Sequence, residues 1–156
     1  MRQLIRRNGK IDGLRAVLLA LVLLGVFGTA GELALERHWH DWIQILPWIA
    51  VGGICVGLAA LSIRTTPATI WLARALAALA VAFALVGIWQ HLAANYDTAP
   101  LDYRYTDIWE TMTRLERWWA VLSGAVGPAP LLASGILLQV GVAFAALTGG
   151  LDRTSR

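Results

Sequence analysis

Three histidines and three acids are the first residues of this chain that could do chemistry. They are His38, His40, His91, Glu32, Glu36 and Asp41. Imidazole nitrogens are common ligands of zinc, copper and haem iron, and carboxylates complete the coordination shell of many metals. On a continued helix Glu32, Glu36 and His40 would share one face, because they are four residues apart. The set therefore defines a candidate metal or haem site.

The same residues also fit a structural role. The chain has no HxxxH, ExxH or CxxC pattern, which are spacings typical of compact metal sites. Hydrogen bonds among the polar groups and to interfacial water would also explain them. We rank this structural role first, a metal site second and a haem site third. The single cysteine, Cys55, forms no internal disulfide and fits inert packing. No nucleophile–base pair or cofactor fingerprint is present, so the only enzyme class that we consider is a membrane oxidoreductase.

Four apolar stretches must position these groups. Of the 156 residues 58% are hydrophobic and 15% are charged, against about 25% charged in a typical soluble domain. The stretches cover residues 13–35, 42–63, 70–91 and 130–147, each close to the ~20 residues with which a helix crosses a hydrocarbon core of ~30 Å. Their continuous apolar character favours helices over barrel strands. The sequence predicts an all-α fold, an integral membrane four-helix bundle that forms a single domain over residues 1–156.

Nine of the 13 basic residues gather at one end of these spans, and eight of the ten acids at the other. The nine are Arg2, Arg6, Arg7, Lys10, Arg15, Arg64, Arg74, Arg153 and Arg156. The positive-inside rule then predicts a multi-pass protein of a bacterial inner membrane with both termini in the cytoplasm. Gly28-Thr29-Ala30 after an apolar stretch also matches a signal-peptide cleavage site, but we expect a retained span. The net charge of +3 follows from this topology, and no nucleic-acid partner is expected.

Small residues on the expected spans predict how the helices pack. Helices in a bilayer associate by close backbone contact, so glycine and alanine mark contact faces. The second span contains a GxxxG pattern, and the third is rich in alanine. We expect the packing residues to be Gly53, Gly57, Ala77, Gly135, Gln139 and Gly141. These faces suit a compact bundle, and they equally suit docking against a helix of another subunit.

Two polar residues fall inside the expected membrane segments. Glu32 lies in the last turn of the first span, where a carboxylate is costly unless it is paired. It would either handle a proton or an ion, or extend to the interface. Gln139, in the middle of the fourth span, is expected to make an interhelical hydrogen bond worth about 0.6–2 kcal/mol. No chain of charged residues crosses the expected membrane, which disfavours a pump or a channel.

The loop before the fourth span predicts a further element. Across residues 103–119 apolar side chains recur at helical spacing, with charged ones on the other faces. Asp107 and Glu110 resemble a capping box, and Glu110–Arg114 is a favourable i,i+4 pair. We expect an interfacial amphipathic helix over this segment, rather than a lid over the bundle. Six of the eight tryptophans would form a belt at this outer side: Trp39, Trp42, Trp89, Trp109, Trp118 and Trp119.

Three short patterns combine polar residues of neighbouring spans. They are His38-x-x-Asp41-x-x-Gln44-x-x-Pro47, Gly87-x-x-x-His91-x-x-x-Asn95 and Gly135-x-x-x-Gln139. They resemble a group of small four-span bacterial integral membrane proteins with no assigned activity. The resemblance covers most of the chain and implies the topology, with a preferred set of His38, Asp41, Gln44, His91, Asn95 and Gln139. The chain departs from the group at Asp97-Thr-Ala-Pro and in the tryptophan-rich loop.

These observations predict a non-catalytic accessory or structural subunit of a larger inner-membrane complex, of respiratory or photosynthetic type. Its partners would be the lipid bilayer and other membrane subunits. A membrane redox protein that binds a metal or haem through the outer histidines is the second hypothesis. A small transporter with a polar cavity around Glu32 and Gln139 is the third.

Overall fold

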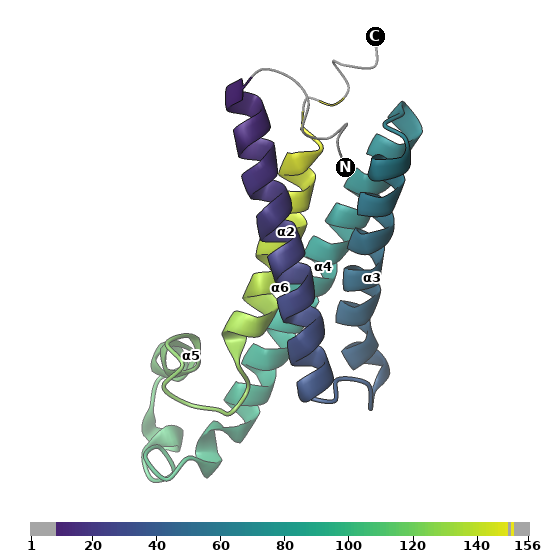
Figure 1. Cartoon of the computed structure of the whole chain (residues 1–156). Helices are drawn as coiled ribbons and strands as arrows, with labels where there is room; N and C mark the ends of the chain where they lie inside the picture. The colour runs from purple at the N-terminus through teal and green to yellow at the C-terminus, as the bar shows by residue number, and fades with distance from the viewer. Residues whose placement is uncertain (1–8, 150, 152–156) are drawn as a thin grey trace.

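The computed structural model of the chain describes residues 9–149 and 151, and within them every regular element is a helix (Figure 1). Four long helices lie side by side: α2 (Gly9–Leu35), α3 (Trp42–Ile63), α4 (Pro67–Thr98) and α6 (Leu131–Leu147). Between α4 and α6 stand the 3₁₀ helices η1 (Ala99–Leu101) and η2 (Trp109–Thr111) and the short helix α5 (Arg114–Leu122). The all-α fold predicted from the sequence is confirmed.

Three of these helices are long and apolar enough to cross a lipid bilayer. The segments are Gly13–Leu35, Trp42–Ile63 and Pro67–Leu101, and they mark the chain as a membrane protein in contact with lipid. Helix α6 is also apolar but has only 17 residues, a length of about 26 Å. Helix α3 coincides with the expected second span, whereas α4 extends beyond the expected third span at both ends.

The residues before α4 explain its early start. Thr66 Oγ1 accepts a hydrogen bond from the backbone N–H of Thr69 at 3.2 Å, and Thr69 Oγ1 accepts one from the N–H of Thr66 at 2.9 Å. Pro67 occupies the first helical position, where its missing N–H costs little. This capping box begins the helix ahead of the expected residue 70.

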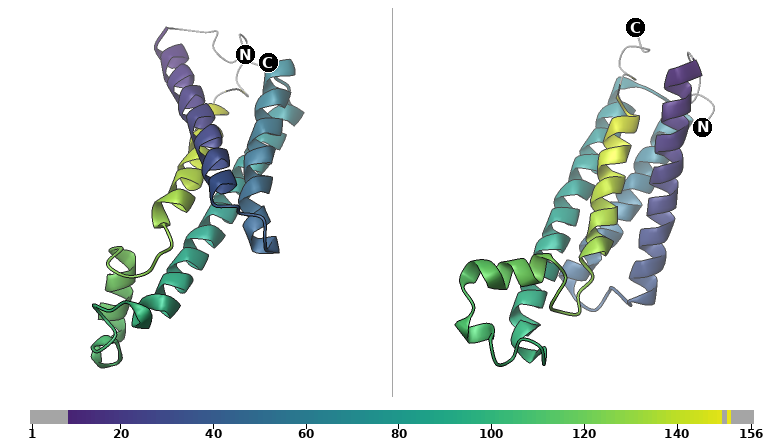
Figure 2. Two further views of the ribbon diagram at one scale, coloured as in Figure 1. Left: turned by 60° about the horizontal axis from the view of Figure 1, so that its bottom comes forward. Right: turned by 90° about the vertical axis from the view of Figure 1, so that its left-hand side faces the viewer.

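The long helices pack in the order α2, α6, α4, α3. Helix α6 lies between α2 and α4, and α3 lies against α4, whereas α2 and α3 touch little despite the short turn that joins them. Both views of Figure 2 show α6 beside α2, although these helices are far apart in the sequence. The fully buried side chains Val22, Ile54, Ile70 and Phe144 come one from each helix, so a single apolar core joins all four.

Small residues bring α6 very close to α4. A Cβ atom added to Gly141 would lie 2.9 Å from Val81 Cγ2, 3.2 Å from the Val81 backbone nitrogen and 3.3 Å from the Ala77 carbonyl oxygen. Ala77 itself is fully buried. The two backbones can approach to this distance only because neither residue carries a larger side chain.

The GxxxG pattern of α3 is used inside the chain. A Cβ atom on Gly57 would lie 2.7 Å from Phe144 Cζ, and one on Gly53 would lie 3.2 Å from Leu76 Cδ2. The pattern therefore faces α4 and α6, and it is already covered by the chain's own helices.

Residues 99–126 form a small unit beside the end of α4, which we call the lobe (Figures 1 and 2). Its core consists of Ala99, Trp109, Ala120, Val121 and Val126. Leu92 and Tyr96 of α4 pack against this core, which explains why α4 continues past the expected end at residue 91. Trp109, expected in the interfacial belt, is only 2% exposed because its indole fills the centre of the lobe.

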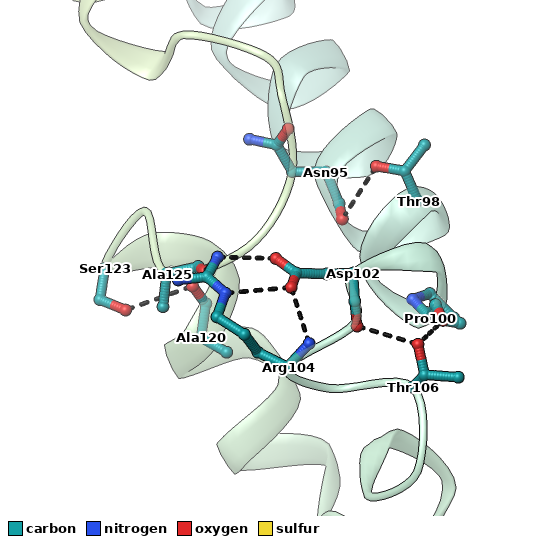
Figure 3. Close-up of polar contacts among 9 residues, drawn as sticks. All are labelled: Asn95, Thr98, Pro100, Asp102, Arg104, Thr106, Ala120, Ser123 and Ala125. Carbon is teal, nitrogen blue, oxygen red and sulfur yellow. Dashed lines mark hydrogen bonds and ion pairs between the residues drawn. The ribbon is translucent and has the colours of Figure 1, made fainter.

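Turns replace the first half of the helix expected over residues 103–119. The Asp102 carboxylate accepts hydrogen bonds from the Arg104 backbone N–H at 3.0 Å and from the Arg104 guanidinium at 2.7 Å (Figure 3). The same guanidinium donates to the Ala125 carbonyl oxygen at 2.7 Å, which ties the start of the lobe to its end. These local bonds hold a turn where a helix was expected.

Helix α5 begins only at Arg114, because the capping box lies later in the sequence than expected. Thr113 and Glu116 form it: the Glu116 carboxylate accepts from the Thr113 N–H at 2.7 Å and from the Thr113 hydroxyl at 2.8 Å. Glu110 consequently lies before the helix, where it pairs with Arg117 at 3.4 Å rather than with Arg114.

We expect the stability of α5 to fall in acid because of Glu116. The hydrogen bonds from Thr113 lower the pKa of the Glu116 carboxyl below its usual value. The ionised form is thus favoured in the folded state. Its stabilising contribution is complete above the ordinary glutamate pKa of about 4.3, and it is lost as the pH falls through the lowered pKa.

Amide-exchange protection of residues 116–120, corrected for intrinsic rates, measures this loss between about pH 6 and pH 3. In the matched variant Glu116→Gln the loss should be absent, because the amide keeps a carbonyl acceptor but does not ionise. An identical acid-dependent loss in both proteins would contradict the prediction.

Arginines close the end of the helices opposite the lobe. Arg15 donates to the Gly149 carbonyl oxygen at 3.2 Å, and Arg74 donates to the Thr148 carbonyl oxygen at 3.3 Å. These cations bond carbonyl groups of the two residues that directly follow α6, where the helix dipole favours a positive charge. The other basic residues of the expected cytoplasmic group include Arg2, Arg6, Arg7, Arg153 and Arg156, which lie outside the described residues.

Candidate functional site

A cavity of about 420 Å³ lies at the lobe end of the four long helices. Helix α2 lines it with one face, from Thr29 through Glu32 to Glu36. Glu36 is exposed, Glu32 is half-buried and Thr29 is buried, so this face runs from the mouth of the cavity to its floor. The polar groups of the cavity therefore lie at graded depths.

The other three helices and the α2–α3 turn complete the walls. The turn contributes His38 and Asp41, α3 contributes Gln44, and α4 contributes His91 with its neighbour Gln90. Apolar side chains make up much of the remaining surface: Leu33, Ile43, Leu46, Phe83, Ala84, Val86 and Leu137. The site thus combines an apolar body with a small number of polar groups, the usual character of a small-molecule pocket.

The α2–α3 turn separates the roles of its two histidines. Arg37 has a left-handed backbone with φ of 50°, and the carbonyl of His38 accepts a hydrogen bond from Trp48 Nε1 at 2.8 Å. His38 lines the cavity in this position. His40 lies outside it, because its Nδ1 atom bonds the Arg37 carbonyl oxygen at 2.8 Å and its ring stacks on Trp39.

Asn95 fixes the part of the wall that precedes α6. Its side chain is 1% exposed, donates to the Ala129 carbonyl oxygen at 2.9 Å and accepts from the Ala129 N–H at 2.8 Å. Gly127, with φ of 88°, leaves room for this amide, because any Cβ there would collide with it. Ala129 and Pro130 line the cavity, so Asn95 is a positioning residue for the site.

Two buried polar atoms at the cavity have no hydrogen-bond partner among the described residues. They are Thr29 Oγ1 and His91 Nδ1. Thr29 is only 4% exposed. Buried polar atoms are nearly always hydrogen-bonded, so two unpartnered atoms at one cavity indicate a place where another molecule supplies the bonds.

The expected metal-binding residues surround this cavity, with the exception of His40. Glu32, Glu36, His38, Asp41 and His91 all line it. Across residues 9–149 and 151, however, no three His, Cys, Asp or Glu side chains converge closely enough to hold a metal ion. The acids and histidines are therefore distributed around a cavity rather than gathered into a coordination shell.

Part of this lining was not predicted from the sequence. Thr29 lies one turn before Glu32 on the same face of α2, and this spacing could have indicated that Thr29 belongs to the site. Ser134 of α6 also lines the cavity, beside Gly87, but nothing in its local sequence indicated this. Of the residues implied by the resemblance, Gln139 is exposed on α6 and is not part of the lining.

Most of the other expected interfacial tryptophans are exposed near the lobe end. Trp39, Trp42, Trp89 and Trp119 are largely accessible. Trp118 is half-buried, stacked on Trp89 with ring centroids 6.1 Å apart. None of these five tryptophans is among the residues that line the cavity.

The residues that form the cavity are widely separated in the sequence, from Thr29 to Ser134, and only the packing of four helices brings them together. Their arrangement has the features of a binding site. The chain matches no protein-family model, no curated protein and no solved structure.

Proposed function

We propose that the protein is a non-catalytic accessory subunit of a larger complex in a bacterial inner membrane. In this proposal four helices cross the bilayer, and a partner subunit covers the outward face of α6. The exposed amide of Gln139 is the observation that carries it.

The position of α6 supports a fourth crossing. It packs along α2 and α4, begins at the lobe end and ends close to Arg15 and Arg74, so it runs from one end of the bundle towards the other. Its length of about 26 Å is slightly below a ~30 Å hydrocarbon core, and small mismatches of this kind cost only fractions of a kcal/mol per ångström. The positive-inside rule would place the arginine end in the cytoplasm and the lobe outside.

The lobe suits the membrane surface on that outer side. On α5 the side chains of Leu115, Trp119 and Leu122 form one exposed apolar stripe, while Ala120 and Val121 face the core of the lobe. An exposed apolar stripe beside charged residues is the pattern of a helix that lies at the headgroup level. Helix α5 thus takes the interfacial role expected for the longer segment.

Gln139 indicates where a partner would dock. It stands at the middle of α6, on an exposed face with Gly135, Ile136 and Val142, which we call the Gln139 face. Its amide makes no hydrogen bond to any described residue, and an unpaired amide in hydrocarbon is costly. A Cβ atom on Gly135 would meet nothing within 4 Å, so a second backbone could approach closely beside the amide.

Native mass measurement of the full chain, extracted from its own membranes in mild detergent, tests the proposal. We expect a stoichiometric heteromeric complex, and we expect Gln139→Leu to weaken it about 3- to 20-fold through loss of an interhelical hydrogen bond. Val56→Leu, at an exposed position of α3 away from this face, should leave the complex intact. A monomer or a pure homodimer of the wild-type chain would overturn the accessory role.

A further inference from the structure

We infer that the cavity at the lobe end binds a protonated amine attached to an apolar group. The inference does not depend on the accessory role, because it concerns an internal site away from the Gln139 face. It rests on the charge of the lining, on two unpartnered buried atoms and on the apolar walls.

The charge of the lining favours a cation. Three carboxylate side chains, those of Glu32, Glu36 and Asp41, line the cavity, and none of the described lining residues is a lysine or an arginine. In a partly desolvated site such carboxylates attract a positive charge more strongly than they would in water. They also repel anions, which disfavours phosphate and carboxylate ligands.

The buried atoms favour a ligand that forms hydrogen bonds. Thr29 Oγ1, on a side chain 96% buried, lies one helical turn below Glu32 and has no partner in the described part of the chain. His91 Nδ1, on a half-buried side chain of α4, is also a buried atom without a partner among the described residues. An ammonium group carries up to three N–H donors, so it can bond a carboxylate oxygen and a neutral acceptor together.

The shape and the walls exclude a bare metal ion as the occupant. No three ligating side chains converge in the described residues, whereas a metal ion requires such a shell. The volume of about 420 Å³ is much larger than one ion needs and falls in the range of small-molecule pockets. Leu33, Phe83 and Leu137 offer an apolar surface for the rest of the ligand.

Two sources could present this chemistry. One is a free amphipathic amine that enters past Glu36 and Asp41, which are exposed at the mouth. The other is the ethanolamine headgroup of a membrane lipid. Both would place an ammonium group beside Glu32. A competition experiment distinguishes the free amine from the lipid headgroup.

Binding of 2-phenylethylamine to the full chain in phosphatidylcholine nanodiscs tests the inference, with empty nanodiscs as the reference. We expect saturable binding by the wild-type chain and much weaker binding of the uncharged analogue 2-phenylethanol. Glu32→Gln should reduce the affinity about 10- to 150-fold, and Thr29→Val about 2- to 12-fold. Glu110→Gln, which removes an exposed carboxylate of the lobe, should leave the affinity for the amine unchanged.

Thermal unfolding of each variant shows whether it is folded, and Glu36→Gln at the mouth extends the test should Glu32→Gln fail to fold. Weaker binding of the amine in nanodiscs that contain phosphatidylethanolamine would identify the lipid headgroup as an occupant, and unchanged binding would identify a free amine. No saturable binding, equal binding of the alcohol, or wild-type affinity in folded Glu32→Gln would each overturn the inference.

Discussion

Gly141→Leu is expected to lower the free energy of unfolding by about 3 kcal/mol, the upper part of the usual range for overpacked cores. The new Cβ would stand 3.2 Å from the Val81 backbone nitrogen and 3.3 Å from the Ala77 carbonyl oxygen. Backbone atoms of a helix cannot rotate away as a side chain can. Helix α6 must therefore separate from α4 along its length, with loss of packing on both sides.

Unfolding of the purified chain in detergent micelles, followed by circular dichroism, measures this effect. Gly52→Leu is the matched control, because it adds the same side chain to an exposed position of α3 where a Cβ would meet nothing within 4 Å. We expect this control to stay within about 0.5 kcal/mol of the wild type. Equal stability of the two variants would show that the close contact of α4 and α6 is absent.

The second large effect is expected at Asn95. Leucine has a similar volume but forms no hydrogen bond, so Asn95→Leu leaves both the N–H and the C=O of Ala129 without their partner. Each backbone group left unsatisfied away from water costs about 1–3 kcal/mol. Because Ala129 is only half-buried, we expect a total loss of about 2 kcal/mol.

Amide exchange distinguishes this loss from a general weakening of the fold. In Asn95→Leu residues 124–130 should lose protection first, because they form the segment that the amide holds against α4. Thr98→Val is the control one turn away, since the Thr98 hydroxyl donates only to the carbonyl groups of its own helix. Protection in the segment that is unchanged by Asn95→Leu would refute the positioning role.

The sequence predicted the membrane helices better than the elements around them. Residues 42–63 form α3 as expected, because an apolar run between the polar Asp41 and Arg64 leaves little choice of boundary. The extension of α4 to Thr98 could not be predicted, since it is polar and is held by contacts of Leu92 and Tyr96 with the lobe. Hydropathy reports only the part of a helix that faces lipid.

The lobe shows how a helical pattern can mislead. Apolar residues at helical spacing over residues 103–119 also result from turns folded around one large side chain, and Trp109 takes that place. The Asp102–Arg104 turn competes locally with helix formation, and its outcome depends on the distant Ala125 carbonyl. Local propensity therefore gave the correct type of element for α5, but a start that is too early.

The candidate site was predictable in composition and not in geometry. The sequence indicated that Glu32, His38 and His91 belong at one level of the membrane, because each lies near the end of an apolar run. It did not indicate that they surround a cavity instead of meeting at a metal. That distinction follows from the spatial order of the four helices, which no single stretch of sequence encodes.

The same spatial order has a consequence for biogenesis. During synthesis α2 and α3 emerge before α6, yet they touch each other little, and the surface that α2 packs against is supplied by α6. Until α6 is inserted, the hairpin of α2 and α3 therefore lies in the bilayer with the packing face of α2 uncovered. Assembly of the four helices is completed only after α6 has been synthesised, and chains truncated before α6 lack the surface against which α2 packs.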